Sequence, residues 1–135
     1  MFAIKAAISD PGAKRFAFRE QKTMYGGKKI ARGDTVFVFA SENAGGSGLV
    51  ARGIVVSIEA TPRKPGVDRQ TPRVSITLRR TALARRALGR NELKRFSAWN
   101  DGRPETELNF KLYRQATNKI AGISAETAAF LNRFF

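Results

Sequence analysis

The chain has 135 residues, of which 42% are hydrophobic, and its 25 Lys and Arg against 11 Asp and Glu give a net charge of +14. This length and hydrophobic content predict one domain, residues 1–135, with a packed core, and exclude a disordered tail. The absence of His and Cys excludes disulfides, Ser-His catalysis and thiolate metal sites, so we expect neither a cofactor nor a metal.

The excess of positive charge favours a polyanionic partner. Nucleic acid is the first candidate and an anionic membrane surface the second, whereas the alternative is a charge that only keeps the protein soluble. The opening residues, MFAIKAAISDPG, are too short and too soon interrupted for a secretory signal, and no apolar run reaches the length of a membrane span. We therefore expect a cytoplasmic protein with no membrane partner.

The first third of the chain predicts one strand and then an irregular segment. Residues 2–8 alternate weakly and end at the Asp-Pro-Gly turn of residues 10–12. Residues 13–32 are basic and aromatic without a clear period, so we expect them to be mostly irregular, with at most a short strand or helical turn. One interpretation is a loop packed over a barrel end. The other is a binding segment, in which hydrogen-bonding or stacking side chains come from Arg19, Gln21 and Tyr25.

Residues 33–60 predict a central hairpin around which the rest of the chain is organised. Two apolar strands, residues 35–41 and 49–60, flank a loop rich in Gly, Ser and Asn. The first strand is apolar on both faces, as is typical of a central strand. Either this strand is simply core, or the face from Phe37 to Ser41 lines a pocket whose members include Phe39, Ser41 and Asn43.

The middle of the chain carries a loop, a strand and the densest basic run. Residues 61–72 contain three prolines and predict a loop, whereas residues 73–80 alternate as a half-buried strand. The polar outer face of that strand suits either a phosphate backbone or solvent. Residues 81–96 are ambiguous, with Asn91 predicted to cap a short helix. The basic residues that we expect to contact phosphate are Arg79, Arg85 and Arg86.

The only tryptophan, Trp99, stands at a loop edge beside basic residues. It is either an aromatic that covers the core or a stacking platform, because stacking on an aromatic is worth about 1–3 kcal/mol per base. The C-terminal part predicts a helix in residues 105–115, an extended piece in 119–123 and a last helix capped by Ser124. The apolar face of that last helix consists of Phe130, Leu131, Phe134 and Phe135.

Carboxylate chemistry is the remaining route to catalysis. Glu92-Leu93-Lys94, with Asp68 upstream, is weakly similar to the Glu-x-Lys end of a metal-dependent nuclease site. Such a site needs carboxylates on neighbouring strands, whereas the pattern places Asp68 in a Pro-rich loop and Glu92 in a helix. A nuclease is therefore the least favoured of the functions considered.

The pattern of residues 33–41, Gly-Asp-x-Val-Phe-x-Phe-x-Ser, followed by Gly-Leu-Val-Ala-x-Gly-x-Val in residues 48–55, resembles the PUA-like superfamily. The resemblance is to EVE-type domains, relatives of the eukaryotic YTH readers. Residues 18–34 resemble the lead-in of that family, and residues 112–126 are similar to its last strand and helix. The chain departs from the family where Phe16 and Phe18 stand in place of its tryptophan and Phe39-Ala40 in place of its aromatic-His pair.

The resemblance implies an α+β fold, a strongly curved mixed sheet or barrel flanked by short helices, with a pocket for a flipped, often modified, base. Carried onto this sequence, the pocket residues are Arg19, Gln21, Ser41 and Asn43, and Trp99 is added on chemical grounds. Single-stranded substrates are slightly favoured because they avoid the cost of unstacking a duplex.

The leading hypothesis is thus a non-enzymatic nucleic-acid-binding domain, with no preference between DNA and RNA and no prediction of oligomeric state. The alternative is a protein-interaction module whose basic charge is incidental.

Overall fold

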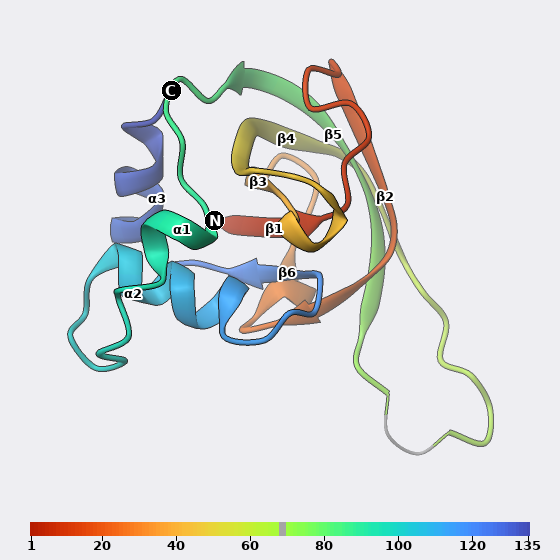
Figure 1. Cartoon of the computed structure of the whole chain (residues 1–135). Helices are drawn as coiled ribbons and strands as arrows, with labels where there is room; N and C mark the ends of the chain where they lie inside the picture. The colour runs from red at the N-terminus through yellow and green to blue at the C-terminus, as the bar shows by residue number, and fades with distance from the viewer. Residues whose placement is uncertain (68–69) are drawn as a thin grey trace.

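The computed structural model describes residues 1–67 and 70–135 and shows a six-stranded closed barrel with short helices on one side (Figure 1). Around the barrel the strands follow the order β1-β3-β4-β5-β2-β6, and β6 pairs with β1 to close it. The pairs β1–β3 and β2–β6 are parallel, and the other four are antiparallel. The strands are β1 (Phe2–Ala6), β2 (Arg15–Met24), β3 (Thr35–Ala40), β4 (Gly48–Ala60), β5 (Arg73–Leu83) and β6 (Lys119–Gly122). The predicted α+β barrel is confirmed.

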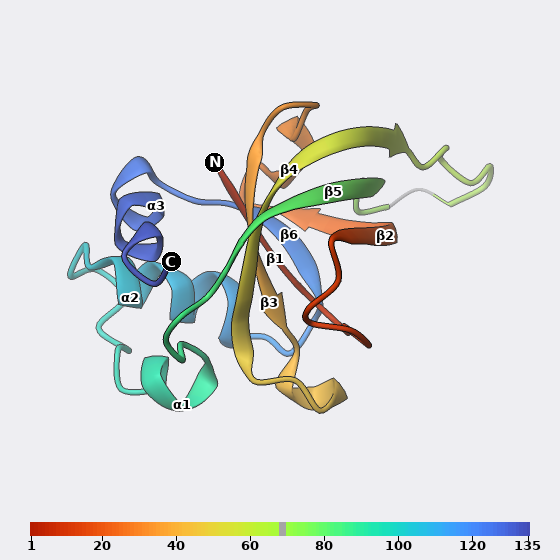
Figure 2. The same cartoon turned by 90° about the horizontal axis from the view of Figure 1, so that it is seen from above.

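The helices are short, and α1, α2 and α3 cover the same side of the barrel, as the view from above shows (Figure 2). Ser124 caps α3 as expected, because its Oγ accepts a hydrogen bond from the Thr127 N–H at 3.1 Å. Among the helices of the described residues, none is long and apolar enough to cross a membrane. The helical segments are η1 (Gly27–Lys29), η2 (Glu42–Ala44), α1 (Arg90–Leu93), α2 (Pro104–Leu108), η3 (Asn109–Tyr113) and α3 (Ala125–Asn132).

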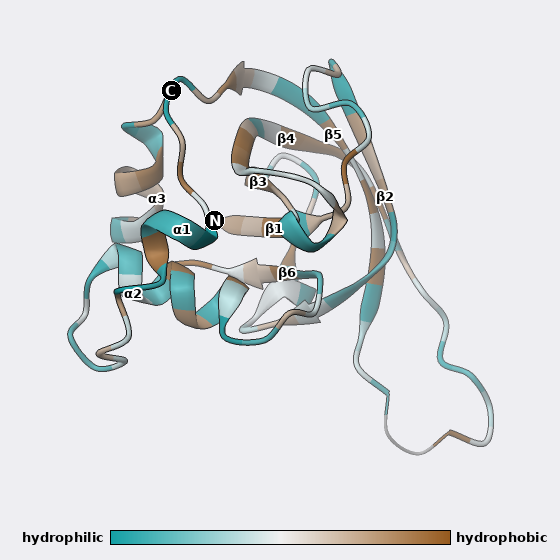
Figure 3. Cartoon of the chain, viewed as in Figure 1, coloured by the Kyte–Doolittle hydropathy of each residue, from teal (hydrophilic) through white to brown (hydrophobic). Residues whose placement is uncertain are grey.

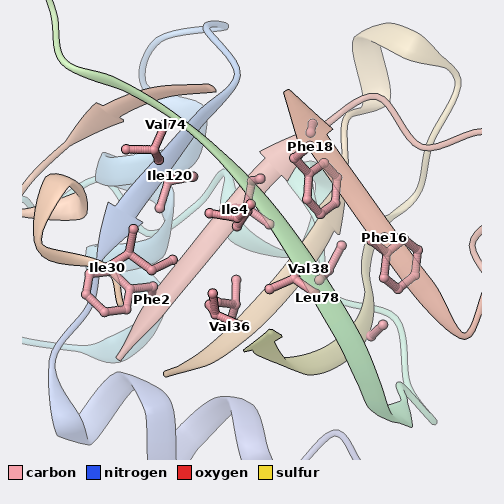
Figure 4. Packing of buried hydrophobic residues seen from close by; sticks show 14 residues of the cluster. Phe2, Ile4, Phe16, Phe18, Ile30, Val36, Val38, Val74, Leu78 and Ile120 are labelled. Atoms are coloured by element: carbon pink, nitrogen blue, oxygen red, sulfur yellow. The ribbon is translucent and has the colours of Figure 1, made fainter. Parts of the chain in front are cut away.

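Strand β3 separates two hydrophobic cores, which confirms that it is apolar on both faces. Val36 and Val38 point into the barrel, where they pack with Ile4 and Leu78 (Figure 4). Phe37 and Phe39 point the other way, into the core between the barrel and the helices. All four β3 side chains are fully buried. Phe39 therefore packs between the barrel and the helices.

Strand β2 corrects the expectation that residues 13–32 are mostly irregular. Phe16 and Phe18 fill the barrel opposite Leu78 and Ile76 of β5. The pairing then shifts between Phe18 and Gln21, where Glu20 takes a φ of 49°. This bulge interrupts the alternation of apolar residues along the sequence, so the period-two pattern of a ten-residue strand is lost.

The segment after β5 also differs from the expectation. Helix α1 begins at Arg90, and its N-cap is Gly89, not Asn91. The Glu92 Oε1 accepts the Gly89 N–H at 2.8 Å, and this bond replaces a side-chain cap. Figure 3 shows α1 as mainly hydrophilic, and of its residues only Leu93 is buried. The helix predicted for residues 105–115 begins as α2 and passes into a π turn, η3.

Strands β4 and β5 form the longest antiparallel pair and extend beyond the barrel as a ribbon (Figures 1 and 2). Residues 61–67 and 70–72, the described part of the predicted Pro-rich loop, lie at the far end of this ribbon and form no strand or helix. Strand β6, in contrast, joins β2 through only two residue pairs, Thr23 with Ile120 and Met24 with Ala121.

Candidate nucleic-acid interface

Three aromatic rings from separate parts of the chain form a row, which we call the aromatic surface: Tyr25, Phe110 and Trp99. The centroid of the Phe110 ring lies 5.9 Å from that of Tyr25 and 5.5 Å from that of Trp99. Trp99 is 45% exposed and Tyr25 is 39% exposed. Two residues predicted to bind nucleic acid, Tyr25 and Trp99, are thus brought together by Phe110, which the sequence analysis did not single out.

Cationic side chains lie over these rings. The Arg114 guanidinium carbon is 4.8 Å from the centroid of the Phe110 ring and 5.9 Å from that of Trp99. The Lys111 ammonium is 5.6 Å from the centroid of the Tyr25 ring. A hollow of about 200 Å³ opens between Trp99, Arg103 and Phe110. Flat rings beside cations offer both a stacking face and a phosphate contact.

A strained turn holds Tyr25 at the surface. Tyr25 has a φ of 53° and Gly26 a φ of 82°, so both residues adopt the left-handed conformation that side chains other than Gly seldom take. The turn is pressed against β6, because a Cβ at Gly122 would lie 2.5 Å from the Tyr25 carbonyl oxygen. The position of the ring is therefore set by close backbone packing.

Glu107 fixes the helix that carries Phe110. Its carboxylate accepts hydrogen bonds from Ser124 Oγ at 2.6 Å and Thr127 Oγ1 at 2.7 Å, and it pairs with Lys111 at 3.1 Å. Burial acts to raise the pKa of Glu107, but these hydrogen bonds outweigh it and hold the pKa below its usual value. The carboxylate thus joins α2 and η3 to the start of α3.

The end of β3 is more enclosed than the pocket hypothesis expects. Ser41 is only 2% exposed, and its backbone N–H donates to the Ala6 carbonyl at 2.8 Å. Asn43 is exposed, and its Oδ1 accepts a hydrogen bond from Arg90 Nη2 at 2.7 Å. Because Phe39 and Ser41 are covered, Asn43 is the residue of this group whose side chain a ligand can reach.

Two buried lysines that were not predicted from the sequence lie near this strand end. Lys5 and Lys119 are each 1% exposed and stand directly opposite one another on β1 and β6. Their ammonium groups donate to the carbonyls of Ala116 at 3.3 Å and Gln115 at 3.4 Å. The sequence offers a weak signal, since each lysine adjoins buried apolar residues in a short strand.

The surroundings of the two lysines shift several pKa values. Burial, together with the charges of Lys5 and Lys22, lowers the pKa of Lys119 to about 8. Burial also lowers the pKa of Lys5, although the Glu42 carboxylate acts against it. Burial raises the pKa of Tyr113, whose hydroxyl donates to Glu42 Oε1 at 3.1 Å. Buried groups with shifted pKa values gather at functional sites more often than elsewhere.

The predicted arginines fall in other places. Arg86 donates to the Arg133 carbonyl at 2.9 Å and covers the Phe134 ring at 4.4 Å, so it lies against the C-terminal end of the chain. Arg85 is exposed beside it, and Arg79 is exposed on the outer face of β5. Arg19 and Gln21 flank the bulge of β2, where Gln21 Nε2 donates to the Arg19 carbonyl at 2.8 Å. The predicted site is therefore spread over several surfaces.

The carboxylates proposed for a nuclease do not form a metal site in the described part of the chain. Glu92 bonds to the N-cap of α1, and Asp68 lies outside the described residues. Within residues 1–67 and 70–135, no group of three or more acidic, His or Cys side chains is placed to hold a metal ion.

No family model and no curated protein matches the sequence. Solved structures share its fold. The DUF55 domain of human thymocyte nuclear protein 1 matches with a TM-score of 0.59 at 14% identity, over 96% of this chain and 94% of that one. The chain shares the fold of this DUF55 domain, which is the PUA-like α+β fold that the resemblance implied.

Two further structures share this fold. Human THYN1, in a complex with DNA that contains 5-methylcytosine, matches with a TM-score of 0.60 at 13% identity, over 96% of this chain and 93% of that one. A hypothetical protein from Leishmania major matches with a TM-score of 0.61 at 16% identity, over 98% of this chain and 91% of that one. The resemblance deduced from the Gly-Asp hairpin is therefore confirmed at the level of the fold.

Proposed function

We propose that this EVE-type domain is a non-enzymatic nucleic-acid-binding protein that recognises a modified base. The observation that carries the proposal is the aromatic surface of Tyr25, Phe110 and Trp99 with Arg114 over it. The net charge of +14 supplies the attraction to a polyanion. The structure of THYN1 with DNA containing 5-methylcytosine supports the idea that this fold can present a base-reading site.

The predicted residues take different roles in this proposal. Trp99 and Tyr25 stack on bases, because their rings are exposed. Phe39 and Ser41 are covered and position the strand end that carries Asn43. The polar and basic contacts to bases and phosphates come from Arg19, Gln21, Asn43, Arg79, Arg85 and Arg86. Single strands are favoured, since a base that is already unstacked costs less to bind.

Oligonucleotide titration of wild type and Trp99→Ala tests the proposal. Single-stranded and duplex oligonucleotides, with cytosine or 5-methylcytosine, are titrated over a range of salt concentrations. We expect affinity to fall as salt rises, and the loss of one stacked base to weaken binding roughly 5- to 150-fold. Leu83→Ala is the matched control, because Leu83 is also an exposed apolar side chain, at 46%.

Two results would refute the proposal. An affinity that does not change with salt would remove the polyanion partner. A loss in Trp99→Ala no greater than that in Leu83→Ala would show that the aromatic surface does not bind bases. Equal affinity for cytosine and 5-methylcytosine would restrict the function to binding without recognition of this modification.

A further inference from the structure

The largest hollow described on the molecule lies where the β4–β5 ribbon passes into its loop, and no aromatic residue is among its described lining residues. It has a volume of about 750 Å³, and residues of the ribbon loop line it together with Glu20 and Lys22 of β2 and Lys28 of η1. We call it the ribbon groove. Its charged lining consists of Lys22, Lys28, Arg63, Lys64 and Arg73, with Glu20 as the one acidic residue among the described lining residues.

Hydrogen bonds from the ribbon loop and β2 shape this groove. Gln70 closes the loop on itself, since its side chain accepts from the Lys64 N–H at 2.9 Å and donates to the Lys64 carbonyl at 2.8 Å. Thr23 of β2 holds the other end of the loop through the Pro72 carbonyl at 2.8 Å. The Arg73 guanidinium donates to the Glu20 carbonyl at 2.9 Å. The groove is therefore built from contacts between the loop, β5 and β2.

The side chains that line the ribbon groove indicate which class of ligand it binds. Five cationic residues line the groove, and none of the described lining residues carries an aromatic ring. Without a stacking face, the groove has no means to hold a base, whereas ammonium and guanidinium groups suit phosphate oxygens. The lining therefore matches a sugar-phosphate backbone.

In the sequence, one turn separates lining residues of the groove from Tyr25 of the aromatic surface. Lys22 and Lys28 lie on either side of the strained turn at Tyr25 and Gly26. We propose that the ribbon groove binds the phosphodiester backbone of the same strand whose base stacks on the aromatic surface. This inference rests on the proposed function, and it assigns to the groove a contribution to affinity that does not depend on sequence or methylation.

The test compares two double variants that each remove two exposed lysines. Lys28→Gln with Lys64→Gln changes the groove, and Lys14→Gln with Lys94→Gln is the control at sites outside it. For a single strand, the loss of two phosphate contacts lowers the slope of log affinity against log salt by about 1.4, which is about 25-fold in affinity near 0.1 M salt. We expect this loss for the groove variant on methylated and unmethylated strands alike, and a much smaller loss for the control.

The outcomes separate the two proposals. If wild type binds no oligonucleotide even at low salt, both the proposed function and this inference are overturned. If wild type binds and the two double variants lose affinity equally, only the ribbon groove is overturned. A loss in the groove variant that is confined to methylated strands would also contradict it, because it would indicate base reading and not backbone binding.

Discussion

Replacing Lys119 by Met tests whether a buried ammonium destabilises the barrel. Lys119 is 1% exposed, and its pKa of about 8, against an ordinary 10.5, corresponds to a cost of about 3 kcal/mol for carrying the charge at neutral pH. Met keeps the apolar stem and loses the hydrogen bond to the Gln115 carbonyl, worth about 1 kcal/mol. We therefore expect Lys119→Met to raise the free energy of unfolding by about 2 kcal/mol near pH 7, or the melting temperature by about 7 °C.

The pH dependence of the free energy of unfolding tests the cost of the buried Lys119 charge independently. Because the folded pKa of Lys119 is lower than the unfolded one, the unfolded chain binds more protons between these values, and stability rises with pH. Wild type should gain about 2 kcal/mol between about pH 7 and pH 9.5 from this group. The lowered pKa of Lys5 acts in the same direction. The stability of Lys119→Met should therefore still rise with pH, but by less than that of wild type. The comparison is restricted to pH values below 10, because above pH 10 the raised pKa of Tyr113 makes stability fall as the pH rises.

Urea unfolding of wild type, Lys119→Met and the exposed control Lys94→Met at both pH values measures these free energies. Lys94→Met should match wild type at each pH. A variant Lys119→Met that unfolds at lower urea than wild type near pH 7, or a wild-type stability that does not change with pH, would refute the reasoning about the buried charge.

Three other substitutions separate stability from binding. Ser124→Ala removes the cap of α3 and a partner of Glu107, so urea unfolding should show a loss of about 1–2 kcal/mol. Tyr25→Asn keeps the left-handed turn, so stability should stay within about 0.5 kcal/mol of wild type while oligonucleotide affinity falls roughly 5-fold or more. The lowered pKa of Glu107 supports stability above its unfolded pKa and ceases to do so as the pH falls through the folded value. Thermal unfolding of Glu107→Gln should therefore be flatter with pH than wild type below about pH 5.

The hairpin of β3 and β4 could be predicted because its signals are local. Alternating β-branched and aromatic residues specify strands, and a strand apolar on both faces must lie between two layers. The cap at Ser124 is predictable for the same reason, since an N-cap depends on residues within one turn. The α+β barrel itself was predicted from the family resemblance that these hairpin residues carry.

The parts that were wrong or missed depend on contacts distant in sequence. The bulge after Phe18 hides the period of β2, although its pairing with β5 makes it a full strand. Lys5 and Lys119 look like solvent-exposed residues until β1 and β6 pair, which leaves each 1% exposed, with the Lys5 ammonium 5.2 Å from the centroid of the Tyr113 ring. Trp99 and Tyr25 were singled out for their chemistry, but only the packing of Phe110 between them makes one surface. No local sequence pattern predicts that these three rings come together.

The junction between β2 and β6 consists of two residue pairs, and the Tyr25 turn follows it directly. Of the six strand pairs around the barrel, β2–β6 has the fewest paired residues. Separating these two strands would therefore break the fewest hydrogen bonds. Amide hydrogen exchange at Thr23, Met24 and Ile120 would report such opening. A nucleic-acid strand bound on both sides of this turn would hold β2 and β6 together. Binding at the aromatic surface and closure of the barrel would therefore stabilise one another.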